Sequence, residues 1–358
     1  MTERVLSSAS GREAAAGGPA RPKRIATIDQ LRGYAIFGMI VVNYIGSFKV
    51  MPWIFHHNKT GFSYADTIAP LFIFVVGMGF RLSLKRRSET LGAMRAHLHA
   101  AKRYAILFIL GVAFYGPAYH IDWWDALTDI GLGGLLALPF INKKTWVRVT
   151  AACGYMIFYM GIYMGTCYGT EFMRRSMNGG PMGPFSWVFI LLFGTIAYDL
   201  IATHDRRKIV TQSLAWGVGL SVLGWILVPL FKDWGGEYYA QYGPFWPLSK
   251  RWCIAPSMIW STGLCFLTFL LFYWINDILK FQFPHLTILG ENPLIIYVLQ
   301  YSLLEMNHTY VDHLQERWGF EQNTLGDIPI ALIGFVIFYL FCYACAKRLH
   351  DQKIIVKI

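Results

Sequence analysis

Long runs of uncharged, apolar residues recur along the whole chain, and they constrain its fold more than any other feature. A helix needs about 20 such residues to cross the hydrocarbon core of a bilayer. Ten runs of about this length fall near residues 30–48, 64–84, 103–121, 125–141, 147–166, 184–202, 209–231, 252–276, 286–305 and 328–346. With 55% hydrophobic and only 15% charged residues, the chain does not have the composition of a soluble surface. We therefore predict an all-α integral membrane protein, a bundle of about ten transmembrane helices.

The distribution of Lys and Arg predicts the topology of this bundle. With the N-terminus inside, the inward connections hold 23 of these residues and the outward connections hold 8. Cytoplasmic loops carry such an excess, so we predict an N-in, C-in topology. The net charge of +11 is spread between apolar runs and forms no single basic face, which argues against nucleic-acid binding.

The two ends of the chain differ from its apolar body. Residues 1–22 are rich in Ala, Gly and Ser and lack the continuous apolar core of a signal peptide, so we expect a disordered cytosolic tail. Residues 23–350 form one polytopic membrane domain, and residues 351–358 form a cytosolic C-terminal tail.

The first two apolar runs and the loop between them carry the most suggestive polar residues. Asp29 and Arg32 lie at the start of the first run, Asn43 lies near its end, and His56 and His57 lie in the loop. Ionisable and polar groups at membrane depth are functional candidates. A structural alternative is that Asp29 pairs with Arg32 at the interface while Asn43 only joins two helices.

Asp66 lies at the start of the second run, three residues after Ser63. Ser63 suits a helix cap, and an acidic side chain is stabilised at the positive N-terminal end of a helix. The functional alternative is that Asp66 orients a histidine of the preceding loop and fixes its tautomer.

Seven cations lie between residues 81 and 103, which we interpret as a cytosolic loop. Anionic lipid head groups or a phosphate-rich ligand would both be attracted to it. His308 and His313 in a later loop, and the pair Cys342 and Cys345 inside an apolar run, are weak metal signals, and we expect no metal.

Four stretches resemble, in order, a known family: the transmembrane acyltransferases typified by heparan-α-glucosaminide N-acetyltransferase and its bacterial relatives. They are TIDQLRGYAIFGMIVVNYIG, HHNKTGFSYADTIAPLFIFVVG, WPLSKRWCIAPSMIWSTG and LGENPLIIYV, and together they span roughly residues 24–300. Two departures are Lys59-Thr60, where the family has Trp-Asn, and Ser249, where it has Asn.

The resemblance implies transfer of an acetyl or short acyl group from cytosolic acyl-CoA, with acetyl-CoA as the expected donor. It places the catalytic histidine at His56, ten residues before Asp66, which would hold its ring. Asn43 would donate to the developing oxyanion. The histidine would act either as a general base or as a transiently acylated nucleophile. The residues expected to bind the cofactor are Asp29, Arg32, Arg81, Lys85, Lys250, Arg251 and Asn292.

The expected acceptor is a sugar amine or hydroxyl of a glycan or glycoside on the non-cytoplasmic side of a bacterial-type cytoplasmic (inner) membrane. Membrane lipids are expected partners, a homodimer is a further option, and no nucleic acid is expected. The competing hypothesis is a polytopic transporter or permease for a small polar solute, since buried polar groups also mark transport pathways.

Overall fold

The computed structural model describes residues 25–57, 61–115, 124, 126–168, 178–232, 248, 252–304 and 327–356, and within these ranges the regular elements are helices. The described helices are α1 (Ala26–Ile45), α2 (Tyr64–Leu91), α3 (Ala93–Tyr115), α4 (Ala126–Ala137), α5 (Thr145–Gly165), α6 (Gly183–Ile201), α7 (Arg206–Lys232), α9 (Ala255–Tyr273), α10 (Pro284–Glu291) and α12 (Asp327–Asp351). Short turns η1 (Trp53–Phe55) and η4 (Gly180–Met182), a π-turn η7 (Trp274–Ile278) and a further helix, Pro293–Leu304, complete them.

Six of these helices are long and apolar enough to cross a membrane: α2, α5, α6 with η4, α7, α9 with η7, and α12. The all-helical membrane class is thereby confirmed, whereas the predicted number of about ten spans is not. The run expected at 286–305 is broken at Asn292 into two short helices. Although α1 has 20 residues, it carries polar side chains at both ends, and it packs against protein on most sides.

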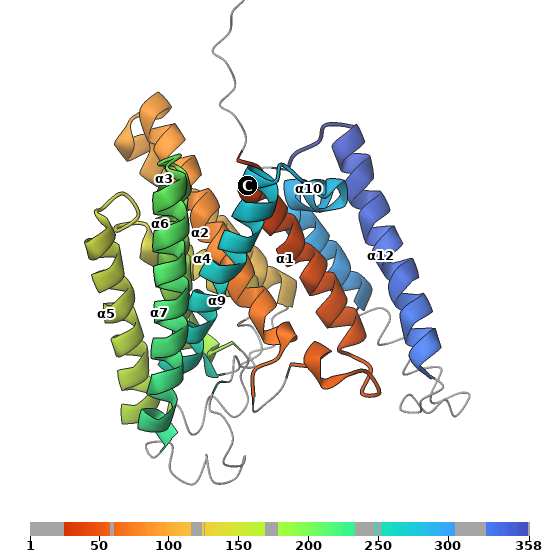
Figure 1. Cartoon of the computed structure of the whole chain (residues 1–358), viewed down its shortest axis with the longest axis horizontal. Helices are drawn as coiled ribbons and strands as arrows, with labels where there is room; N and C mark the ends of the chain where they lie inside the picture. The colour runs from red at the N-terminus through yellow and green to blue at the C-terminus, as the bar shows by residue number, and fades with distance from the viewer. Residues whose placement is uncertain are drawn as a thin grey trace, which may run out of the picture.

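The basic segment 81–103 is helical, so its prediction as a loop was wrong. Helix α2 continues to Leu91, and α3 begins at Ala93. Gly92 between them has a φ of +83°, a backbone conformation that glycine adopts without strain. The cations therefore lie on a helical hairpin that extends the bundle at one end (Figure 1).

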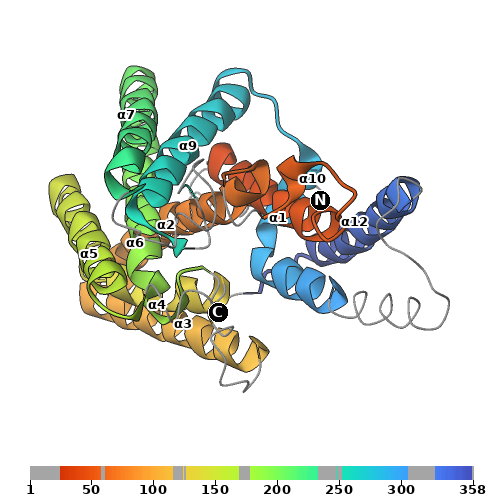
Figure 2. The same cartoon turned by 90° about the horizontal axis from the view of Figure 1, so that it is seen from below.

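Helix α6 forms the centre of the larger half of the bundle. In the 18-residue apolar stretch of α6, 89% of the residues are buried, whereas only 17% are buried in the corresponding stretch of α12 at the periphery. Helices α2, α4 and α5 pack against α6, and α7 packs against α9 (Figures 1 and 2). Gly77 of α2 and Gly194 of α6 meet closely enough that a side chain at either would overlap the other helix's backbone. Small residues at such contacts let membrane helices approach closely.

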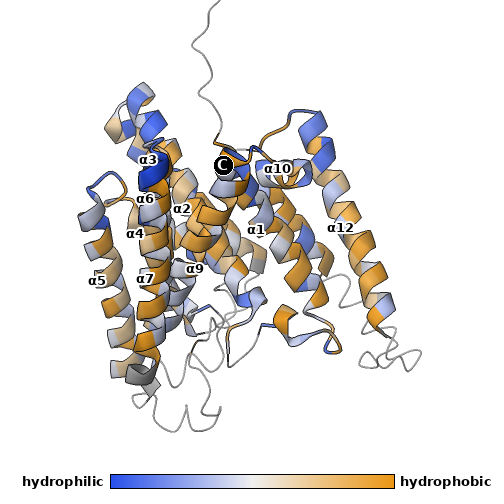
Figure 3. Cartoon of the chain, viewed as in Figure 1, coloured by the Kyte–Doolittle hydropathy of each residue, from blue (hydrophilic) through white to orange (hydrophobic). Residues whose placement is uncertain are grey.

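The outer surface has the pattern of a membrane protein. Apolar residues run along α5, α7 and α12, while hydrophilic residues gather at the upper ends of α3, α7 and α12 (Figure 3). Ile25 and Ile355, near the two ends of the described chain, line the same cavity at this upper end. Turn η1 and the loop before α2 lie at the opposite end (Figure 1).

Candidate functional site

The connection between α1 and α2 places both histidines of the loop against fixed polar groups. His56 follows η1, and its ring nitrogens lie near two backbone carbonyls: Nδ1 is 3.0 Å from Gly46 O and Nε2 is 2.8 Å from Met51 O. A neutral imidazole carries one N–H, so it donates to only one of these carbonyls at a time. These contacts hold the partly buried His56 ring against the C-terminal end of α1.

His57 contacts the first turn of α2. Its Nδ1 lies 3.1 Å from Oδ1 of Asp66, which is 1% exposed, whereas the His57 side chain is 44% exposed. Ser63 and Asp66 form a capping box, in which the Ser63 N–H donates to the Asp66 carboxylate at 3.0 Å. The Ser63 hydroxyl also donates to the carbonyl of His56 at 2.7 Å. One helix cap therefore positions both histidines.

This geometry confirms the expected cap and corrects the predicted partner of Asp66. We predicted that Asp66 would hold His56, but the carboxylate contacts His57, and the His56 ring turns toward the backbone of α1 and the loop. An Nδ1–H donated to a buried carboxylate leaves Nε2 with the lone pair, which is the arrangement of a base with its orienting acid.

Asn43 lies one turn before Gly46, whose carbonyl contacts His56, so the structure brings it to the same end of the bundle. Its side chain is partly buried, and within the described residues its amide makes no hydrogen bond. An amide in this state can donate to a ligand.

At the opposite end, Asp29 and Arg32 lie in a cavity of about 210 Å³ together with Arg86 and Glu291. Arg32 Nη1 is 3.5 Å from Asp29 Oδ1, so the pairing that the sequence analysis gave as a structural alternative is present. The same nitrogen lies 3.4 Å from the carbonyl of Gly290, which ties α1 to the end of α10. Arg86, which the sequence analysis did not single out, is thereby identified as a neighbour of Arg32.

The other predicted cofactor residues are distributed differently. Arg81 is engaged on the side of α2 facing α6, where its Nε donates to Asp199 at 3.0 Å. Lys85 is exposed, while Lys250 and Arg251 lie outside the described residues. Asn292 is 3% exposed and anchors the C-terminal segment. Its amide N–H donates to the carbonyl of residue 354, and its oxygen accepts the N–H of residue 356, both at 2.9 Å. Its predicted contact with a cofactor stays a prediction.

A buried ion-pair network that was not predicted from the sequence joins α2, α5 and α6. Arg148, one of the 23 Lys and Arg residues counted in the inward connections, is 1% exposed and bonds to Asp199 and to the hydroxyl of Thr195. The available signal was the position of Arg148 within the apolar run 147–166, where an arginine needs a partner.

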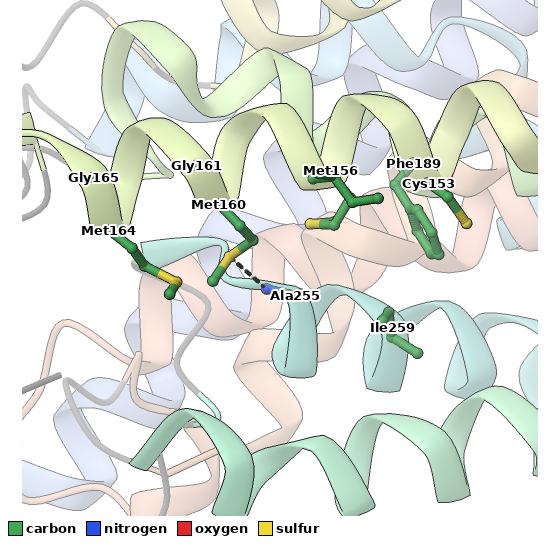
Figure 4. Close-up of a pocket in the computed structure, with 10 residues that line it drawn as sticks. Cys153, Met156, Met160, Gly161, Met164, Gly165, Phe189, Ala255 and Ile259 are labelled. Atoms are coloured by element: carbon green, nitrogen blue, oxygen red, sulfur yellow. Dashed lines mark hydrogen bonds between the residues drawn. The ribbon is translucent and has the colours of Figure 1, made fainter. Parts of the chain in front are cut away.

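A second, apolar cavity of about 900 Å³ lies between α5, α6 and α9 (Figure 4). Met156, Met160 and Met164 face it from one side of α5, and Ala255 and Ile259 of α9 lie opposite. The Ala255 N–H donates to the Met160 sulfur at 3.4 Å. The residues that line it include no histidine or carboxylate. Over the described part of the chain, no three His, Cys, Asp or Glu side chains cluster as metal ligands do.

The fold and the site define a polytopic helical membrane protein with a histidine–carboxylate pair at one end of its bundle and, at the other, a cavity lined by two arginines and two carboxylates. A family model described as heparan-alpha-glucosaminide N-acetyltransferase, catalytic, matches residues 24–227. The chain belongs to this family, as predicted, and the first two of the four quoted stretches lie within the matched segment.

Two curated relatives match parts of the chain. An uncharacterized 39.9 kDa protein in the amylase 3' region of Bacillus acidopullulyticus is 32% identical over 142 residues, which cover 38% of this chain and 39% of that protein. The heparan-alpha-glucosaminide N-acetyltransferase of Homo sapiens is 31% identical over 118 residues, which cover 32% of this chain and 17% of that protein. The matches thus span well under half of either relative.

Proposed function

We propose that this protein is an integral membrane acetyltransferase that moves an acetyl group from cytosolic acetyl-CoA to a sugar amine or hydroxyl on the non-cytoplasmic side. The observation that carries the proposal is the His57–Asp66 pair beside His56, which lies inside the segment matched by the family's catalytic model. The excess of Lys and Arg at the end where the described chain begins and ends supports N-in, C-in insertion in a bacterial-type cytoplasmic membrane.

The site residues suit attack on a thioester. A histidine of the loop takes the proton of the acceptor's amine or hydroxyl as that group attacks the carbonyl carbon. The new C–N or C–O bond forms, the C–S bond breaks, and the CoA thiolate receives a proton as it leaves. Asn43 donates its amide N–H to the oxyanion of the tetrahedral intermediate. The resemblance assigns the proton transfer to His56, whereas the carboxylate partner favours His57.

The donor's phosphates would bind at the opposite end. Arg32 and Arg86 line one cavity there, and guanidinium groups bind phosphate oxygens in a bidentate manner. Asp29 and Glu291 in the same cavity would orient the two cations. Lys85 is exposed at this end and adds positive charge, while Arg81 is already committed to Asp199. This supports a donor site at Arg32 and Arg86 more than at Arg81.

The test is acetyl transfer from labelled acetyl-CoA by purified protein, with His56→Ala and His57→Ala compared with His99→Ala. The control histidine is exposed on α3, in the helical hairpin at the opposite end of the bundle from the loop that carries His56 and His57 (Figure 1). We expect the variant that lacks the base to lose about a hundredfold to ten-thousandfold in rate, and His99→Ala to match wild type. Full activity in both loop variants would refute this site.

The same preparation tests the two mechanisms and the competing class. Label that stays on the protein before acceptor is added, and is lost in His56→Ala, indicates an acyl-histidine; no retained label indicates direct transfer in a ternary complex. Protein that binds no acetyl-CoA but exchanges a polar solute after reconstitution would be a transporter instead, and the proposed function would fail.

A further inference from the structure

Gln300 is a buried amide that makes no hydrogen bond. It lies on the helix Pro293–Leu304 with its side chain 0% exposed, and neither its nitrogen nor its oxygen has a partner. Among the described residues, it is the side chain in which both a donor and an acceptor atom are buried and unpaired. Gln30 on α1 is equally buried but fully engaged: it bonds to Thr287 and to both the N–H and the carbonyl of Phe283.

An unpaired amide is costly in a protein interior, because folding removes its water without replacing the hydrogen bonds. An apolar side chain of the same size would avoid this cost. The rest of the inner face of this helix is apolar or aromatic: Ile296, Tyr297 and Leu304 lie three or four residues from Gln300 and are buried. A ligand that supplies one donor and one acceptor would satisfy the amide.

Gln300 lies between the two ends of the proposed reaction path. Glu291, at the start of this segment, shares the cavity of Arg32, and the segment then descends toward the end that carries η1 (Figure 1). At 1.5 Å per residue, Gln300 lies about 12 Å beyond Asn292, and Asn43 lies about 16 Å along α1 from Arg32. The adjacent Tyr301 packs on Phe114, in the last turn of α3, with ring centroids 5.3 Å apart. The Gln300 amide is therefore deep in the bundle, short of the level of Asn43.

We propose that Gln300 binds the two amide groups of the pantetheine arm of the acyl-CoA donor, an inference that rests on the proposed function. The arm joins the phosphates to the thioester and contains two secondary amides, each with one N–H and one carbonyl. Because each trans amide points its N–H and its carbonyl in opposite directions, the Gln300 amide would donate to the carbonyl of one and accept from the N–H of the other. An extended arm of this size spans roughly 14 Å, estimated as four residue-sized units. With its phosphates near Arg32, it places an amide at the depth of Gln300 and the thioester near Asn43.

The experiment compares Gln300→Met with Gln30→Met, two changes of the same chemistry at buried glutamines. Thermal unfolding is measured without ligand, and transfer is measured with acetyl-CoA and with phenyl thioacetate, which has no pantetheine amides. For Gln300→Met we expect an unfolding temperature equal to or above wild type, a KM for acetyl-CoA raised by about tenfold, and an unchanged rate with phenyl thioacetate. For Gln30→Met we expect a lower unfolding temperature. Gln300→Leu provides a second variant if the methionine protein folds poorly.

The outcomes separate this inference from the proposed function. If wild type transfers acetyl from acetyl-CoA but Gln300→Met and Gln300→Leu keep its KM, the pantetheine contact is wrong while the proposed function stands. Destabilisation of Gln300→Met to the extent of Gln30→Met would mean that Gln300 has a structural partner, and it would also overturn the inference. If wild type transfers nothing from either donor, the proposed function itself fails.

Discussion

The change Asp199→Asn removes the carboxylate that joins two arginines within the bundle. Asp199 accepts hydrogen bonds from Arg81 and from Arg148, and the Arg148 side chain is 1% exposed. Without the carboxylate, a buried guanidinium loses its ionic partner. We expect the folded state to lose stability because that charge has no compensating water.

The magnitude follows from the exposure of each group. Removing one partner of a fully buried pair costs about 3–5 kcal/mol. Asp199 is 30% exposed, so water reaches this side of the pair, and asparagine keeps one acceptor oxygen. Arg148 also keeps its 2.7 Å hydrogen bond to Thr195. We therefore expect a loss of about 2–3 kcal/mol in the free energy of unfolding, or a fall of about 5 °C in the midpoint of thermal unfolding.

The matched control is Asp205→Asn. Asp205 pairs with Lys208 at 3.7 Å, and both side chains are exposed, at 42% and 62%. Exposed pairs contribute about 0–1 kcal/mol, and asparagine is as good a helix cap as aspartate. Both variants are unfolded by heating in the same detergent and followed by tryptophan fluorescence. Equal midpoint shifts for Asp199→Asn and Asp205→Asn would refute the argument that burial of Arg148 sets the cost.

Two further predictions concern the joint between α1, α10 and the C-terminus. A Cβ at Gly33 would overlap the carbonyl of Leu286, so Gly33→Ala should lower the free energy of unfolding by about 2 kcal/mol. Gly154 has open space around it, so the control Gly154→Ala should raise the free energy of unfolding by up to about 1 kcal/mol through helix propensity. Thermal unfolding checks both variants, and equal effects would contradict the close contact at Gly33. Asn292→Leu should release the segment 354–356, because it removes both of the side chain's hydrogen bonds to that segment. We expect faster amide hydrogen exchange in this segment, and unchanged exchange would contradict the role of Asn292 in holding it.

Sequence patterns predicted the features that depend on neighbouring residues. Apolar runs located the membrane helices, because burying backbone polar groups in lipid requires helices. The capping box of Ser63 and Asp66 followed from a spacing of three residues. The pairing of Asp29 with Arg32 followed from the same spacing within a helix. In each case, the two partners lie within one helical turn, so local geometry decides the contact.

Contacts between residues on different elements were predicted poorly, because spacing along the sequence does not determine them. Asp66 meets His57 and not His56, because the backbone of the loop turns the two adjacent rings in different directions. Arg148 was counted in an inward connection, and only the packing of α5 against α6 gives it a buried partner.

The sequence alone determined that this chain is a helical membrane protein of an acyltransferase family, with its polar groups concentrated at the two ends of the first helical hairpin. Only the tertiary structure decided how those groups are paired: it held both histidines on one helix cap, joined Arg32 to Arg86 in one cavity, and left the Gln300 amide without a partner. The physical reason is that composition and periodicity report the average environment of a residue, whereas pairing depends on which helices pack together and in what register.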